Sequence, residues 1–205
     1  KIEENNKEIK QWKRTEVLKD YRFYIICMTM LAMPWIATGS FVYQSFISSS
    51  KEWGPYVIAQ SFMAYSILSV ITLFISGFLI DKFTSRKLLI YMNIPLFFAT
   101  VVLYYFSAPL SSFVFFGLLG VTNGLANVLG SSTWAEIYGV KFIGSIKALT
   151  TALMVFSTAF GTALFGFLID IGFTIEYIAI ISGTYIFSSI ILLYLVQNKL
   201  NPQYL

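Results

Sequence analysis

The residues best suited to chemistry gather in one short polar segment that follows an apolar stretch. The stretch ends in Gly77-Phe-Leu-Ile-Asp81, and basic residues follow at Lys82, Arg86 and Lys87. An acid beside cations at a helix end can hold one conformation and release it in another, and each contact contributes about 1 kcal/mol or more if it is partly desolvated. We therefore predict a conformational latch, although the lysines could also belong to a solvated loop. Its members here are Gly77, Asp81, Lys82, Arg86 and Lys87.

A second acid, Glu136, follows a later apolar stretch within Trp134-Ala-Glu-Ile-Tyr138. Counting membrane crossings places it on the same side of the bilayer as Arg86. We predict that Glu136 approaches Arg86 and completes the latch. The alternative is an exposed glutamate at the membrane interface, and the residues alone leave both open.

Other kinds of site are excluded by what the chain lacks. There is no histidine, which removes histidine general acids, proton relays and metal ligands. The single cysteine, Cys27, cannot form an intramolecular disulfide and falls in an apolar stretch, where a small buried side chain is expected. No nucleophile-base pair is visible. We therefore predict no catalytic residue, no metal and no cofactor, and an enzyme is the weakest of the functions considered.

The elements that must position these residues are membrane helices. Of the 205 residues, 57% are hydrophobic and 12% are charged, whereas soluble domains are about 25% charged. One crossing needs about 20 apolar residues. Six charge-free stretches meet that length: 23–47, 56–80, 88–106, 113–133, 148–169 and 177–196. The sequence predicts an all-α integral membrane protein with six transmembrane helices and no room for a soluble catalytic domain.

The basic residues indicate the topology. Seven lie before the first stretch, and the later connections alternate between several and almost none, so that thirteen fall on one side and only Lys51 on the other. The positive-inside rule then places both termini in the cytoplasm, in a plasma or bacterial inner membrane. The net charge of +4 thus reflects topology and a lipid bilayer partner, with no nucleic acid.

Three regions follow from this reading. Residues 23–196 form the six-helix domain, and 197–205 form a cytoplasmic tail. Residues 1–22 carry many charges and a weak apolar stripe through Trp12 and Val17, which predicts a helix lying at the membrane surface. Because the chain begins at a lysine, we expect this segment to be a linker whose upstream partner is missing.

An internal repeat is visible. Gly77-Phe-Leu-Ile-Asp81 recurs identically as Gly166-Phe-Leu-Ile-Asp170, and the copies end the second and fifth stretches. By the charge count the copies lie at opposite faces of the membrane. We predict two inverted three-helix repeats, the arrangement typical of secondary transporters.

The segment after Asp81 resembles the loop signature of the major facilitator superfamily, Gly-x-Leu-x-Asp-basic-x-Gly-basic-basic. Thr84 stands at the usual glycine and Ser85 at a usual basic residue, a pattern similar to the weaker copy in the C-terminal half of these transporters. The resemblance covers all six stretches. It implies that the chain is the second half of a twelve-span protein, that its partner is the missing N-terminal six-helix half, and that an acid at Glu136 pairs with the loop base.

The same resemblance implies where a solute passes, because the first and fourth helices of each half line the central cavity. Asn123 and Asn127, four residues apart, share a helix face. We predict a substrate pathway at Trp35, Thr38, Gln44, Asn123 and Asn127. Hydrogen bonding between helices is the competing role for the asparagines.

Some features narrow the substrate. The chain is also distantly similar to the oxalate/formate and monocarboxylate transporter branch, but it lacks that branch's basic residues within the second and fifth spans, which argues against a carboxylate. No Asp, Glu, Lys or Arg lies in any of the six stretches, so this half offers no ion path. We predict a secondary active or facilitative transporter of a small solute by alternating access. The alternative is a transport-null membrane scaffold or sensor.

Overall fold

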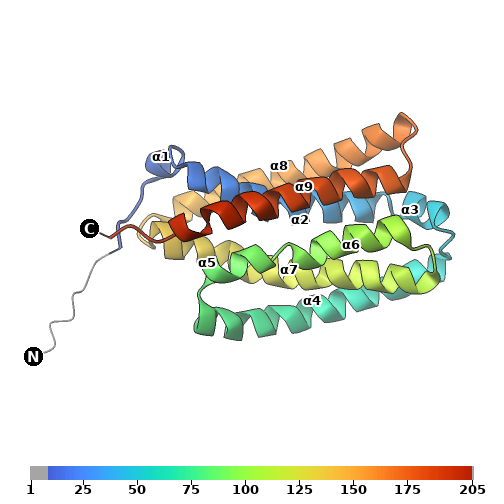
Figure 1. Ribbon diagram of the computed structural model, residues 1–205, viewed down its shortest axis with the longest axis horizontal. Helices are drawn as coiled ribbons and strands as arrows, with labels where there is room; N and C mark the ends of the chain where they lie inside the picture. The colour runs from blue at the N-terminus through green and yellow to red at the C-terminus, as the bar shows by residue number, and fades with distance from the viewer. Residues whose placement is uncertain (1–8, 205) are drawn as a thin grey trace, which may run out of the picture.

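Six helical segments long and apolar enough to cross a membrane run side by side in the computed structural model, which describes residues 9–204 (Figure 1). Four are single helices: α2 (Tyr21–Val42), α4 (Pro55–Phe83), α7 (Pro109–Tyr138) and α8 (Ile143–Asp170). The third segment joins α5 (Ser85–Leu88), the 3-10 turn η1 (Leu89–Tyr91) and α6 (Ile94–Tyr105). The last joins α9 (Ile175–Val196) and the 3-10 turn η2 (Gln197–Lys199). The predicted all-α class and the six spans are confirmed.

Two of the predicted spans differ from the structure, the first in where it ends and the third in its continuity. The first span ends at Val42, and a separate short helix α3 (Gln44–Ser50) follows Tyr43. The third span is interrupted before Ile94, because the proline at position 95 has no N–H and is accommodated in the first turn of a new helix. Pro34, in contrast, lies inside a continuous α2.

Neighbouring helices hold α2 at the turns preceding Pro34. A proline leaves a backbone carbonyl unpaired and makes nearby carbonyls accessible, and in a membrane such groups need partners within the protein. Three side chains from other segments donate to carbonyls of this region. The pairs are Tyr185 to Met28 at 2.8 Å, Asn93 to Thr29 at 2.7 Å, and Ser157 to Leu31 at 3.0 Å. These bonds fix α2 against α8, α9 and the junction between η1 and α6 in the third span.

Helix pairs form around small residues. Helix α4 packs along α7, α2 packs along α8, and α6 packs between α7 and α9. A Cβ on Gly124 of α7 would lie 2.6 Å from the carbonyl oxygen of Ser69 and 2.7 Å from the Cβ of Thr72. A Cβ on Gly161 of α8 would lie 2.6 Å from the Cα of Trp35. Only glycine allows these helices to approach so closely.

The two glycine contacts share a register. The copies of Gly-Phe-Leu-Ile-Asp begin at 77 and 166, an offset of 89 residues. Adding 89 to position 35 gives 124, and adding 89 to position 72 gives 161. The contact of Trp35 with Gly161 therefore corresponds to the contact of Gly124 with Thr72. One close contact between α2 and α8 therefore has an equivalent between α7 and α4 at the spacing of the repeated motif.

Residues 9–20, the described part of the N-terminal segment before α2, do not form the predicted surface helix. Within residues 9–20 only a single turn, α1 (Arg14–Val17), is helical. Trp12 and Val17 are buried in the protein, and the Trp12 ring meets the Tyr138 ring edge-on at 5.5 Å. The apolar stripe read as membrane-facing therefore packs against α7. Lys1 and Lys7, which contributed to the charge count, lie outside the described residues.

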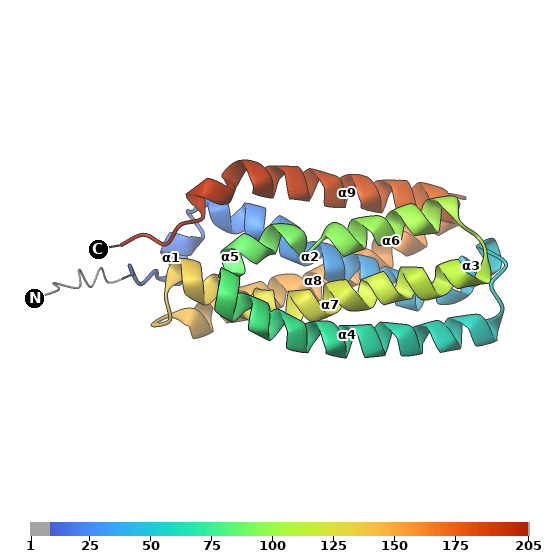
Figure 2. The ribbon, with the colours of Figure 1, turned by 60° about the horizontal axis from the view of Figure 1, so that its bottom comes forward.

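The ends of the bundle differ in charge. The first and last described residues, α1 and α5 lie at one end, and α3 lies at the other, as two views show (Figures 1 and 2). At the α3 end, Lys51 is buried and its Nζ lies 2.8 Å from Glu176 Oε1. The lone lysine predicted for that side is therefore neutralised by an acid.

Candidate functional site

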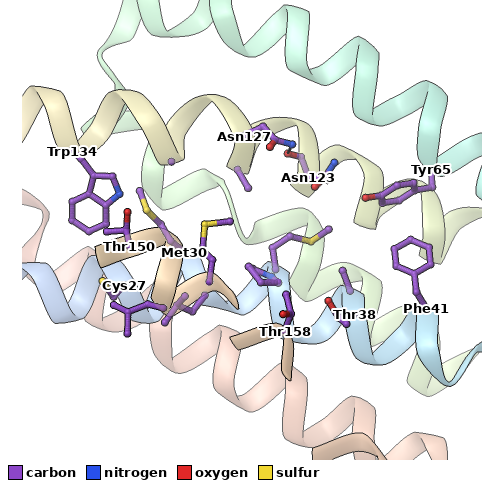
Figure 3. Close-up of a pocket in the computed structure, with 18 residues that line it drawn as sticks. Cys27, Met30, Thr38, Phe41, Tyr65, Asn123, Asn127, Trp134, Thr150 and Thr158 are labelled. Atoms are coloured by element: carbon purple, nitrogen blue, oxygen red, sulfur yellow. Dashed lines mark hydrogen bonds between the residues drawn. The ribbon is translucent and has the colours of Figure 1, made fainter. Parts of the chain in front are cut away.

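A cavity of about 320 Å³ lies between α2, α7 and α8, with Tyr65 of α4 at one end (Figure 3). Three of the five predicted pathway residues line it: Thr38, Asn123 and Asn127. The asparagines lie on α7 and Thr38 lies on α2, so they approach the cavity from different helices (Figure 3).

Both asparagines are held by their amide nitrogens. Asn123 Nδ2 donates to Ser69 Oγ at 2.8 Å, and Asn127 Nδ2 donates to the Asn123 carbonyl at 2.9 Å. In the described part of the chain, no group donates to either amide oxygen. For Asn123, bonding to another helix and contact with a solute are thus compatible, because the nitrogen bonds to Ser69 of α4 and the oxygen is available to a solute; the Asn127 nitrogen bonds within its own helix α7.

Trp35 and Gln44, the other two predicted pathway residues, do not line this cavity. Trp35 is 4% exposed, and its ring packs edge-on against Phe160, Phe165 and Tyr185. Pro34, Thr38 and Phe41 of α2 do line the cavity. These three residues are spaced by four and three positions and so share one face of α2. Trp35 lies on a different face of the helix and points toward α8 and α9. Gln44 begins α3 and borders a separate hollow at the other end of the bundle.

Helix α8 supplies a wall that the sequence reading missed. Thr150, Met154 and Thr158 all line the cavity. Their spacing of four residues is the signal that could have identified them, since it places them on one helix face. The Thr158 Oγ1 also donates to the Val155 carbonyl of its own helix at 2.7 Å.

The wall of the cavity is uncharged. Its described lining contains no Asp, Glu, Lys or Arg; its other members are Cys27, Met30, Leu31, Met33, Ala37, Ala126, Gly130, Trp134 and Leu153. Flexible methionines from α2 and α8 face the same space as the asparagines. Such a surface adapts to apolar groups of varied shape and offers a few hydrogen-bonding positions.

A second cluster lies at the end of the bundle that carries the termini. The Glu136 Oε1 atom lies 3.0 Å from Arg86 Nε, which confirms the predicted approach of these residues. Its Oε2 atom accepts from the backbone N–H groups of Ser85 at 2.9 Å and Arg86 at 3.2 Å, and from the Ser85 hydroxyl at 2.5 Å. Glu136 therefore caps the start of α5 as well as pairing with its arginine.

The other predicted latch residues are not part of this cluster. Asp81, Lys82 and Lys87 are exposed, and none of them forms an ion pair within residues 9–204. Lys82 Nζ lies 5.3 Å from the centre of the Phe83 ring. A Cβ on Gly77 would meet no atom within 4 Å. These four residues all lie at the end of α4 or in the loop after it, on a surface that this chain leaves uncovered.

The fold, the cavity and the loop can now be compared with known proteins. The sequence profile of the Major Facilitator Superfamily matches residues 24–203, which cover all six spans except the first three residues of α2. The chain belongs to the major facilitator superfamily. No curated protein and no solved structure matched the chain in the same comparisons.

As a major facilitator protein, this chain is a membrane transporter, with a lipid bilayer around it and a small-molecule substrate.

The family signature accounts for the geometry of the loop after α4. Thr84, at the signature's glycine, has φ +67° and ψ 142°, a conformation that favours glycine. The turn at this position lets the chain leave α4 and directs the first N–H groups of α5 at Glu136. Ser85, at a usual basic position, is buried and bonded to Glu136.

Proposed function

We propose that this chain is a six-helix half of a transporter that moves a small solute by alternating access. One observation carries the proposal: a cavity lies between the first and fourth spans, α2 and α7, and is lined by Thr38 and the two asparagines. A packed scaffold has no need of such a space, because side chains ordinarily fill helix interfaces to a high density.

The mechanism we propose uses two inverted three-helix repeats, α2 to α6 and α7 to α9. The shared offset of 89 residues in the Gly-Phe-Leu-Ile-Asp copies and in the two glycine contacts supports it. Related units that meet through matched interfaces can rock against each other around a central site.

The other half of the transporter is proposed as the main partner. Helices α4 and α8 present many exposed apolar side chains, more than a single surface-facing stripe requires. On α4 they include Met63, Ile67, Val70, Phe74 and Phe78, and on α8 Met154, Val155, Phe156, Phe160 and Phe167. Lipid could cover part of this surface. Asp81 is exposed as well, and a carboxylate is poorly suited to a surface covered by lipid alone, which supports a protein partner for part of this surface.

The solute that suits this wall is uncharged, or presents an uncharged part to it. A charged group facing the methionines and asparagines would lack a counter-ion in a medium of low dielectric constant. The amide oxygens of Asn123 and Asn127 would accept hydrogen bonds from the solute. Any coupling ion would have to be bound by charged groups outside this cavity, because its described lining has none.

The latch is proposed to act at the loop after α4. Glu136 fixes Ser85 and Arg86, which places Asp81 and Lys82 at the surface that would face the other half. We propose that both termini are cytoplasmic and that the membrane is a plasma or bacterial inner membrane, because basic residues concentrate at the α5 end while Lys51 at the other end is paired with Glu176.

Labelling from both sides of the membrane tests the proposal without knowledge of the substrate. In the full-length protein lacking other reactive cysteines, with Cys27→Ser, an Asn127→Cys variant is treated with an impermeant maleimide in right-side-out and in inverted vesicles. Alternating access predicts labelling in both preparations. The neighbouring Thr122→Cys is the matched control, because Thr122 is fully buried and lies outside the cavity, and it should stay unlabelled. Labelling of Asn127→Cys from one side alone would favour a scaffold or sensor.

A further inference from the structure

A cleft of about 730 Å³ opens at the end of the bundle that carries the termini, separate from the central cavity. It lies between the end of α4, α5 and the segment that follows α9. Its polar lining consists of two cations, Arg86 and Lys87, and three side-chain amides, Gln197, Asn198 and Asn201.

Specific contacts hold the two sides of the cleft together. Arg86 is fixed on one side by Glu136, and its Nη1 donates to Asn201 Oδ1 on the other at 2.5 Å. The Asn201 carbonyl in turn accepts from Arg22 Nη1 at 3.1 Å. Arg22 is buried, and its Nη2 lies 2.7 Å from Asp20 Oδ2. The tail is therefore anchored to the core, and the cleft is organised before any ligand enters.

The charge of the cleft is positive. Among the residues that the structure describes, no carboxylate lines it. The Glu136 carboxylate, which is not part of the lining, pairs with Arg86 and neutralises its charge. Lys87, in contrast, is exposed and has no ion-pair partner among residues 9–204. Asp81, the nearest acid along α4, is exposed but is not part of the lining. A cation beside amide donors matches the oxygens of a phosphate group.

The remaining lining is apolar and lies where the helices end. Phe83 is 45% exposed and Tyr91 is 59% exposed, and both border the cleft together with Leu79 and Leu88. A soluble anion would gain nothing from this surface. An amphiphile would place its phosphate near Lys87 and its chains along the aromatic rings.

We propose that this cleft binds a phosphate-bearing anion, with the headgroup of an anionic phospholipid as the source that its apolar side favours. Basic pockets between helix ends are a general means of holding such headgroups. The site would connect the lipid to Arg86, and through Arg86 to the loop after α4.

Native mass spectrometry of the full-length protein in detergent tests the site, with phosphatidylglycerol, phosphatidylcholine and inorganic phosphate added separately. Phosphatidylglycerol should bind more tightly than phosphatidylcholine, and Lys87→Gln should weaken its binding about fivefold. Lys147→Gln is the matched control, because Lys147 is exposed at the same end of the bundle and lies outside the cleft. Its effect should be less than about twofold.

A second variant, Asn198→Ala, removes an amide from the cleft and should also weaken phosphatidylglycerol binding. Binding of inorganic phosphate that depends on Lys87, without preference for phosphatidylglycerol, would support the phosphate site and assign it to a soluble anion. Equal binding of both lipids with no phosphate binding, or equal effects of Lys87→Gln and Lys147→Gln, would overturn the proposal.

Discussion

Glu136 and Arg86 meet through both the backbone and the side chain of the arginine. The Arg86 N–H donates to Glu136 Oε2 at 3.2 Å, while Arg86 Nε lies 3.0 Å from Oε1. Both side chains are only about a quarter exposed. One carboxylate of α7 thus fixes the position and the orientation of the loop that carries the family signature.

Replacing Glu136 by glutamine should loosen this loop. The variant keeps an acceptor but loses the charge, so we expect a lower unfolding temperature of the full-length protein in detergent, equivalent to about 1 kcal/mol. Glu16→Gln is the control, since Glu16 pairs with Lys10 at 3.6 Å on an exposed surface and should change little. Equal shifts in thermal unfolding for both variants would show that the geometry of the Glu136 pair has no special role.

Replacing Thr84 by glycine should stabilise the protein. Thr84 has φ +67°, which is unfavourable for a β-branched residue, and glycine would remove a cost of about 1 kcal/mol. Thr174→Gly is the control, because Thr174 lies in a connection with φ −77° and gains nothing from the change. Thermal unfolding should move upward for the first variant only. A fall for Thr84→Gly would mean that the threonine side chain contributes more than its backbone costs.

A methyl group at Gly161 should separate α8 from α2. The added carbon would collide with the backbone of Trp35, and backbone cannot move aside as a side chain can. We expect destabilisation of about 2 kcal/mol and less folded protein in size-exclusion chromatography. On the same helix, Gly144→Ala meets no atom within 4 Å and should be tolerated. If both variants behave alike, the close approach of the helices is not required.

Removing the charge of Asp20 should destabilise the folded protein, because the charge of Arg22 would then be buried without a counter-ion. The two side chains are 5% and 6% exposed, and Asp20 also accepts from the Tyr138 hydroxyl at 3.1 Å. Asp20→Asn leaves the arginine without its counter-ion, and we expect destabilisation of about 3 kcal/mol in thermal unfolding. Asp170→Asn changes the same residue type at an exposed helix end and should have little effect. A small shift for Asp20→Asn would imply that water reaches Arg22.

Much of the fold could be predicted from the sequence. The number of spans follows from charge-free stretches, because the transfer of a charge into lipid is costly wherever it occurs in a helix. The approach of Glu136 to Arg86 was also predicted, since alternating spans place both residues at the same end of the bundle. The pair Asn123 and Asn127 lined the cavity as expected, because their spacing of four was enough to place them on one face.

The sequence could not decide which face of each helix is buried. These spans are apolar all round, so Trp35 and Thr38 on the same helix look equally suited to a cavity, and only the packing of α8 and α9 turned Trp35 into the core. The links from Asn201 to Arg22 and Arg86 were equally hidden, because they join residues far apart in the chain. Hydropathy and spacing determine what enters the membrane, whereas the contacts between helices determine what each side chain faces.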